Sequence, residues 1–180
     1  MSNVITNPYN FAVSVVDGGW KEIGRTTLTS SAVSISVASL PNKPYLMVMT
    51  SGETDQTNAD HSYRFAGDTG ANYSERYYFN GGSTGTQTGI TFIRPLGTTA
   101  NQPFFDWCIV ANDGSGHNEN LINGHGVQSQ GSGASASVTR NEYTGKHSTS
   151  SVLDEVEALT TQSGGGVFDY LSGTEVVVLG

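Results

Sequence analysis

The sequence has little charge, a single cysteine and no long hydrophobic run. Lys, Arg, Asp and Glu make up 13% of its 180 residues, about half of the usual share in globular proteins. With Cys108 as the only cysteine, an internal disulfide is excluded. The aliphatic runs, such as residues 176–179, contain only a few residues and are too short to cross a bilayer. We therefore expect one soluble domain that is held together by its own core.

Basic residues are especially scarce. Lys and Arg total eight against 16 Asp and Glu, which gives a net charge of −8, and the eight are scattered singly along the chain. Without a basic stripe, the sequence predicts no nucleic-acid partner and no attraction to an anionic membrane. Residues 1–10 have neither a basic start nor an apolar run, so they do not resemble a secretory signal.

Small and polar residues take the place of the missing charge. The chain has 23 glycines, and Ser, Thr and Asn are abundant, which is typical of short strands joined by many turns. We predict an all-β protein: an antiparallel β-sandwich, jelly-roll-like, with about ten short strands. It forms one domain overall, with an N-terminal arm and first strand in residues 1–20 and the sandwich in residues 21–180.

Alternation of apolar and polar residues places the strands. The clearest patterns are at 32–40, where Val33, Ile35 and Val37 alternate with polar or small residues, and at 104–111. In the second, Phe105, Trp107 and Ile109 share one face. Further strands are predicted at 10–16, 20–28, 45–50, 61–66, 73–79, 89–94, 121–128, 137–143, 151–159 and 175–179. Residues 152–160 also fit one or two helical turns, but the flanking Ser and Thr favour a strand.

The densest polar and aromatic cluster lies at residues 63–79. If the strands at 61–66 and 73–79 pair through the turn at 67–70, Arg64 and Arg76 meet Asp68 or Glu75 across a hairpin. We interpret Arg64, Asp68, Tyr73 and Arg76 as a structural hairpin motif of ion pairs and tyrosine packing. The alternative is a site for a sugar or a carboxylate.

Three consecutive aromatic residues end this segment. Tyr77 and Phe79 should point to one side of the strand and Tyr78 to the other, so one of the two sides is exposed or lies in an interface. We predict Tyr77, Tyr78 and Phe79 as interface or ligand residues, since aromatic side chains serve both protein contacts and sugar stacking.

No catalytic or metal-binding pattern stands out, and we predict no enzyme activity, no cofactor and no metal. The histidines His61, His117, His125 and His147 do not form a zinc motif. Cys108 lies between Trp107 and Ile109, as a buried apolar residue would. The oxygen-rich segment 113–120 departs from the spacing of a calcium loop, although adventitious calcium remains an alternative there. The acidic cluster 154–157 is read as a solvated face, and Gly164 to Gly166 as a turn.

Several segments resemble a group of bacteriophage virion proteins. They are WKEIGRTTLTSSAVSISVASLPNKPYLMV at 20–48, YRFAGDTGANYSERYYFNGG at 63–82, NLINGHGV at 120–127, RNEYTGKH at 140–147 and the closing GTEVVVLG. In order, they are similar to that group's W-x-E-L-G-R-T-T-L opening, its R-F-x-x-D-x-G-x-N-Y centre and its G-S-E-V-V-V-L-G ending. The likeness covers nearly the whole chain after residue 20 and departs from the group at 51–60 and 103–107.

The resemblance implies a non-enzymatic structural protein of the virion with a sandwich fold. We expect a capsid decoration or cement protein that stabilises the head shell, is made in the host cytoplasm and is exposed on the particle surface. Its partners would be the major capsid protein or other virion proteins, and further copies of itself in a homotrimer. The alternative is a receptor-binding or carbohydrate-binding module of a tail or fibre, with a cell-surface glycan as its partner.

Overall fold

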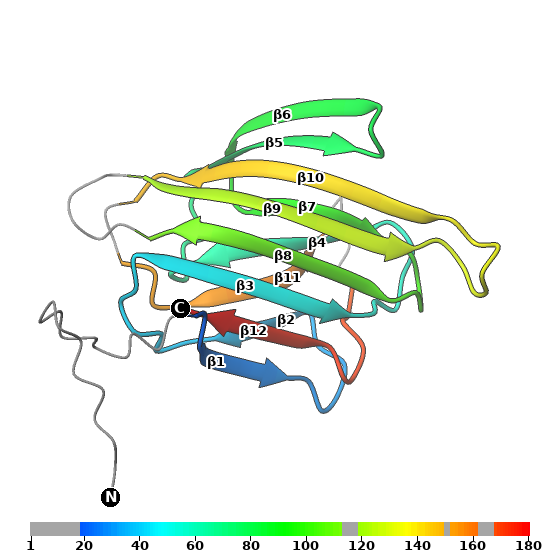
Figure 1. Cartoon of the computed structure of the whole chain (residues 1–180), viewed down its shortest axis with the longest axis horizontal. Coiled ribbons are helices and arrows are strands. Elements are labelled where there is room, and N and C mark those ends of the chain that lie inside the picture. The colour runs from blue at the N-terminus through cyan, green and yellow to red at the C-terminus, as the bar shows by residue number, and fades with distance from the viewer. Residues whose placement is uncertain (1–18, 113–118, 150–151, 162–167) are drawn as a thin grey trace, which may run out of the picture.

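The chain folds into two stacked antiparallel sheets (Figure 1). The computed structural model describes residues 19–112, 119–149, 152–161 and 168–180. These residues contain twelve strands and no helix, so no helix in this part of the chain could cross a membrane. The prediction of an all-β antiparallel sandwich is confirmed.

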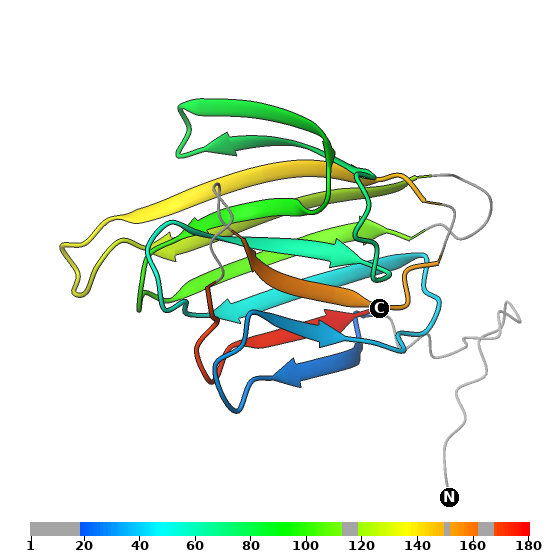
Figure 2. The ribbon, with the colours of Figure 1, turned by 180° about the vertical axis from the view of Figure 1, so that it is seen from behind.

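The larger sheet has eight strands and the smaller has four. In spatial order, the large sheet contains β1 (Glu22–Thr27), β12 (Glu175–Leu179), β3 (Tyr45–Gly52), β8 (Phe104–Ala111), β9 (Asn120–Ser129), β10 (Val138–His147), β5 (Tyr73–Phe79) and β6 (Ser83–Ile90). The small sheet contains β2 (Ser34–Val37), β11 (Val156–Thr161), β4 (Ala59–Phe65) and β7 (Ile93–Thr98). Seen from behind, the small sheet covers the middle of the large one (Figure 2).

The core lies between the two sheets because alternate side chains of both point inward. Leu46, Val48 and Val110 come from the large sheet, and Tyr63 and Phe65 from the small one; all five are completely buried. Chain connections repeatedly cross between the sheets, since β1, β3, β8 and β12 belong to one and β2, β4, β7 and β11 to the other. Residues far apart in the sequence are thereby joined in a single core.

Many of the predicted strands are present, and three match their predicted ranges: 73–79 is β5, 104–111 is β8 and 175–179 is β12. The structure adds β6, which has the sequence STGTQTGI. Its alternation is of Thr with Gly and Gln, and therefore carries no hydrophobic signal. Pro95 follows the strand predicted at 89–94 but lies inside β7, at the edge of the small sheet where a missing N–H is tolerated.

The predicted hairpin between 61–66 and 73–79 is wrong. β4 pairs with β11 and β7 in the small sheet, whereas β5 pairs with β10 and β6 in the large sheet. Residues 66–72 therefore carry the chain from one layer to the other. Short sequence separation favours a hairpin, but each strand finds apolar neighbours in a different sheet.

Two details of the other strands also differ from the prediction. Within 32–40, Ile35 and Val37 are buried, but Val33 is 44% exposed and precedes β2. In 151–159 the strand begins only at Val156, and the preceding described residues have no regular structure. The strand predicted at 10–16 lies outside the described residues.

Candidate functional site

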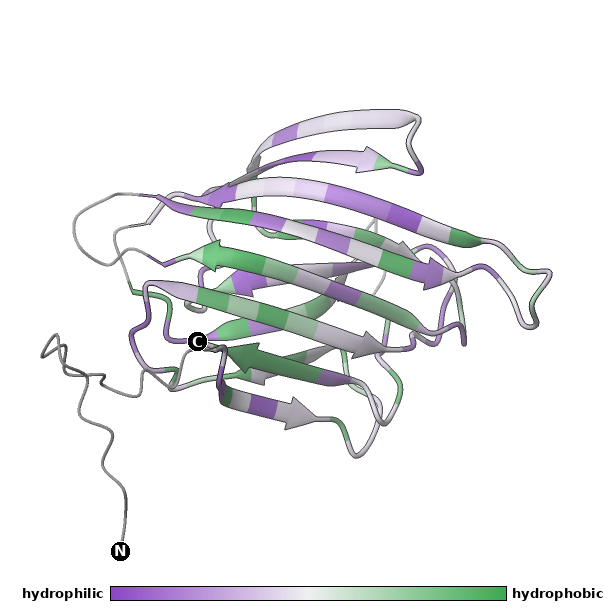
Figure 3. Ribbon diagram, in the orientation of Figure 1, coloured by the Kyte–Doolittle hydropathy of each residue, from purple (hydrophilic) through white to green (hydrophobic). Residues whose placement is uncertain are grey.

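The outer face of the large sheet, the one turned away from the small sheet, is the most unusual surface among the described residues. We define this outer face by the side chains whose sequence neighbours are buried in the core, for example Phe105, Trp107 and Ile109 of β8, which alternate with Asp106, Cys108 and Val110. Its apolar members are Tyr45, Met47, Met49, Phe105, Trp107, Ile109, Leu121, Val127, Val177 and Leu179. Figure 3 shows hydrophobic residues concentrated in β12, β3 and β8. These strands are therefore apolar on both sides.

The opposite surface of the sandwich is built differently. On the outward side of the small sheet, Arg64 Nη1 lies 3.6 Å from Glu157 Oε2, and Arg94 Nη1 lies 3.0 Å from Asp60 Oδ2 at the β7 margin. Ser36 is exposed beside them. The small sheet therefore presents a polar, ion-paired face, in contrast to the apolar outer face of the large sheet.

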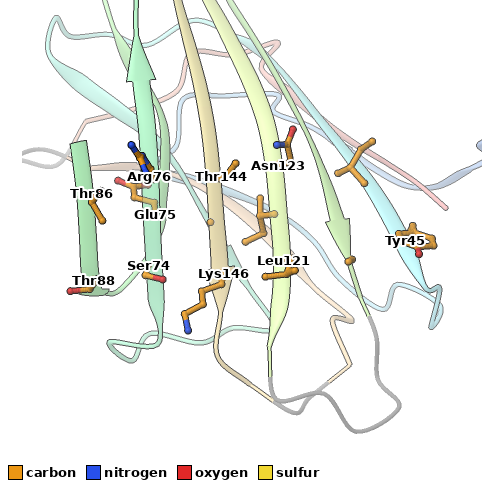
Figure 4. A pocket seen from close by; sticks show the side chains of 14 residues that line it. Tyr45, Ser74, Glu75, Arg76, Thr86, Thr88, Leu121, Asn123, Thr144 and Lys146 are labelled. Carbon is orange, nitrogen blue, oxygen red and sulfur yellow. The ribbon is translucent and has the colours of Figure 1, made fainter. Parts of the chain in front are cut away.

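A hollow of about 650 Å³ lies on the outer face. Tyr45, Ile109 and Leu121 form its apolar part, and Arg76 and Lys146 stand on the side of β5 and β10. Figure 4 shows Leu121 and Tyr45 on one side and Arg76 with Thr86 on the other. The hollow thus combines an apolar floor with cationic side chains, which suits an apolar segment that carries a carboxylate.

A second, more polar hollow adjoins it. Arg76, Tyr78, His125 and Glu142 line it, and the His125 ring stacks on Trp107 with 5.0 Å between ring centroids and 25° between planes. Aromatic faces next to side chains that donate and accept hydrogen bonds are suited to a sugar ring as well as to a protein surface.

Charged groups lie on both sides of the apolar part of the outer face. At the β1 margin, Arg25 Nη2 is 2.7 Å from Glu22 Oε2, and its Nη1 is 2.5 Å from Glu175 Oε2. The hydrogen bonds from Arg25 hold the pKa values of both carboxyls below their usual range. On the other side, β10 carries Arg140, Glu142 and Lys146, with Arg140 Nη2 3.0 Å from Glu142 Oε1, and β5 and β6 lie beyond it.

Of the four residues predicted as a hairpin motif, the structure brings together only Asp68 and Tyr73. The Tyr73 hydroxyl lies 3.1 Å from the Asp68 carbonyl oxygen and accepts a hydrogen bond from the Phe65 amide. Its ring stacks on His147 at 4.4 Å, and His147 Nε2 lies 2.8 Å from Asp68 Oδ2. This contact ties the connection between the sheets to the end of β10. His147 was missed because its partner is 79 residues away.

Arg64 and Arg76 lie on opposite sides of the molecule. Arg64 is on the small sheet, where its Nε donates to the Thr91 carbonyl, and Arg76 is on the outer face of the large sheet. Neither meets Asp68 or Glu75 in the way that the sequence suggested, because β4 and β5 are not neighbours.

The predicted alternation at 77–79 is present. Tyr77 packs against the core, whereas Tyr78 is 38% exposed and lines the second hollow. Phe79 is also exposed, at the end of β5. Tyr77 also lines this hollow, so Tyr77 and Tyr78 lie at the candidate site and Phe79 does not.

A polar cluster inside the sandwich has no access to solvent. The Tyr143 hydroxyl donates a 2.9 Å hydrogen bond to Asp106 Oδ1, His61 Nε2 lies 3.7 Å from the same oxygen, and His61 Nδ1 is 2.6 Å from the Tyr170 hydroxyl. Burial first, and then the charge of Asp106, raise the pKa values of both tyrosines. Because these residues are completely or almost completely buried, we interpret the cluster as a polar link between the sheets.

The other chemical candidates do not converge. Among the described residues there is no group of three or more His, Cys, Asp or Glu side chains that could hold a metal ion. Cys108 is buried, which together with the charge of Asp106 raises its pKa. In the acidic cluster, Asp154 is exposed and Glu157 faces Arg64. His117, most of the oxygen-rich segment and Gly164 to Gly166 lie outside the described residues.

Comparisons with known proteins add no relative: no family model, no curated protein and no solved structure matches the chain. The resemblance of its segments to phage virion proteins therefore stays a prediction. The fold and the outer face remain as the physical basis for a functional proposal.

Proposed function

We propose that this protein is a non-enzymatic structural component of a bacteriophage particle, most specifically a capsid decoration or cement protein. The observation that carries this proposal is the apolar outer face of the large sheet. Contiguous apolar surface on a folded chain marks a place where another molecule binds. The assignment to a phage rests on the resemblance of the segments at 20–48, 63–82, 120–127 and 140–147.

We also propose that the sandwich is a jelly roll with two inserted hairpins. Without β5–β6 and β9–β10, the strand orders become β1-β12-β3-β8 and β2-β11-β4-β7. Eight strands that alternate between two four-stranded sheets in this way are the jelly-roll arrangement, which is common in viral capsid and lectin domains. Both inserted hairpins extend the large sheet on the side of β8, so they enlarge the outer face.

In this role the protein is made in the host cytoplasm and binds the major capsid protein or another virion protein on the particle surface. Buried interface area would then stabilise the shell, because a partner that binds only the assembled state shifts the equilibrium toward it. The protein acts without a cofactor or a catalytic site.

Quantitative proteomics of purified particles that encode this chain tests the proposal, together with localisation by cryo-electron microscopy. We expect many copies per particle, arranged regularly over the head. A copy number near zero contradicts a virion role, and a few copies at the tail tip contradict decoration.

The second candidate is a carbohydrate-binding module of a tail or fibre. The stacked Trp107 and His125 beside Tyr78, Arg76 and Glu142 favour it, since such side chains can hold a sugar ring. A glycan array and an adsorption assay with the free protein test it. Binding that is lost in Trp107→Ala supports this candidate, and the absence of any hit counts against it.

A further inference from the structure

We propose that the outer face of the large sheet binds the same face of a second copy of this chain, around a two-fold axis that runs between β3 and β8 and parallel to them. The inference rests on the proposed use of this face for assembly, and it names the partner and the geometry. It replaces the three-fold arrangement expected from the resemblance with a two-fold one, because a face that binds itself makes an isologous contact.

The register of the strands arranges the outward side chains in rows across the sheet. In one row, Met47 lies beside Ile109, which lies beside Asn123. In the next row, Met49 lies beside Trp107, which lies beside His125. Rotation about a two-fold axis parallel to the strands leaves each row at the same position along the strand direction. It exchanges β3 with β8, β12 with β9, and β1 with β10.

This exchange places apolar side chains opposite one another. Trp107 of one copy faces Met49 of the other, and Ile109 faces Met47. Methionine is flexible enough to fill the gaps around a bulky ring or a branched chain. Outward from the axis, His125 faces Val177 of the second copy.

The same exchange joins opposite charges on both sides of the apolar part of the face. Arg25 and Glu142 belong to the row that contains Trp107, each on the third strand from the axis, so each faces the other across the contact. Packed sheets cross at about 30°. At the distance of β1 and β10 from the axis, this angle displaces the facing strands of the two copies along their length by roughly one row. Arg25 and Glu142 still reach one another because both side chains are long and exposed.

Arg76 gains a partner in this arrangement. Among the described residues it makes no ion pair, and it lies beside Thr144 on the neighbouring strand. Glu22 belongs to the same row, and the exchange places Glu22 of the second copy over Thr144. The β1 edge of each copy then occupies the first hollow of the other, next to the guanidinium of Arg76.

The size and the charge of the face suit a stable dimer. Six overlapping strands, about 4.8 Å apart and about eight residues long at roughly 3.4 Å per residue, cover about 800 Å² on each copy, which is the standard size of a specific interface. The whole chain carries a charge of −8, which opposes association. The outer face, however, carries Arg25, Arg76, Arg140 and Lys146 against Glu22, Glu142 and Glu175, so the face itself is close to neutral and two such faces repel each other only weakly.

Sedimentation of the full chain over a range of concentrations tests the proposal, with a set of matched variants. Arg25→Glu and Glu142→Arg each place like charges opposite one another, and we expect each to weaken dimerisation about tenfold or more. The double variant restores opposite charges and should recover most of the loss. Ile109→Glu, at the centre of the face, should give monomers, whereas the control Ser36→Glu on the small sheet should leave the dimer unchanged.

Unfolding midpoints of the variants verify that each one folds. If Ile109→Glu does not fold, the variants at the exposed Arg25 and Glu142 still test the proposal. A monomer at all concentrations, a trimer, or a dimer that Ser36→Glu weakens and Arg25→Glu does not would overturn the proposal. A monomer that still decorates particles would leave the proposed function in place, and a dimer absent from particles would remove the function but keep the interface.

Discussion

The Tyr143 hydroxyl donates a 2.9 Å hydrogen bond to Asp106 Oδ1 between the two sheets. Both residues belong to the large sheet and point inward, where His61 and Tyr170 approach them from the other side of the core. Asp106 Oδ2 has no partner among the described residues. The hydrogen bond therefore supplies much of what holds this carboxyl group inside the sandwich.

Tyr143→Phe should lower the free energy of unfolding by about 1–3 kcal/mol, because it leaves the buried Asp106 oxygen without its donor. Urea titration followed by far-UV circular dichroism measures the change. Tyr78→Phe is the matched control: its hydroxyl donates to the exposed Gly81 carbonyl, and we expect a change within about 0.5 kcal/mol. Equal losses in the two variants would contradict a special role of the buried bond.

Gly124→Ala should destabilise the fold by about 1–3 kcal/mol through overpacking. A Cβ at this position would lie 2.4 Å from the Tyr143 ring and 2.6 Å from the Trp107 carbonyl oxygen, and the backbone carbonyl cannot move aside cheaply. Gly82→Ala, where a Cβ meets nothing within 4 Å, serves as the control in the same thermal unfolding assay. A midpoint for Gly124→Ala that matches the control would show that the core is looser than described.

Glu75→Gln should change the pH dependence of stability. Burial, only partly offset by the Arg94 amide and guanidinium, raises the pKa of Glu75 to about 7 from 4.5. The folded state therefore holds a proton that the unfolded state loses between these values, and stability falls as the pH rises from about 4.5 to 7. Glutamine does not titrate, so the variant does not lose stability in this way as the pH rises.

We expect the stability of Glu75→Gln relative to the unmodified chain to increase between pH 5 and pH 8, by up to about 3 kcal/mol. Urea midpoints at several pH values measure it. A difference that stays constant with pH would contradict the raised pKa.

Asp68→Asn should cost about 1 kcal/mol at neutral pH by weakening the contact with His147. Burial acts to raise the pKa of Asp68, but hydrogen bonds from His147, Asn72 and the Gly70 amide outweigh it and lower the pKa. The stabilisation by the carboxylate is thus present above the unfolded pKa and is lost as the pH falls through the folded one. Unfolding experiments at pH 7 and in acid measure the difference in stability between the variant and the unmodified chain. This difference should shrink in acid, and a larger difference there would contradict the contact.

Cys108 should react with a thiol reagent only when the chain unfolds. Its side chain is buried in the core, and burial with the nearby Asp106 charge raises its pKa, so little thiolate is present at neutral pH. Labelling with Ellman's reagent across a urea series should follow the unfolding transition. Immediate labelling without denaturant would show that solvent reaches this part of the core.

Part of the candidate site was visible in the sequence. The alternation in 104–111 separated Phe105, Trp107 and Ile109 from Asp106, Cys108 and Val110. It did not show which set faces the core, because both sets contain apolar residues. Only the position of the small sheet makes the second set internal, and the polar Asp106 is tolerated there because Tyr143 comes from a strand 37 residues away.

The sequence by itself determined the class of fold. Few charges, many glycines, the two-residue alternation of β8 and the aliphatic run of β12 are local properties, and local backbone preferences are enough to predict strands. The partners of those strands were decided only by the tertiary structure. Segments 61–66 and 73–79 went to different sheets, and β3, β8 and β12 became apolar on their outer side as well, because pairing depends on the summed contacts of distant residues rather than on any short segment.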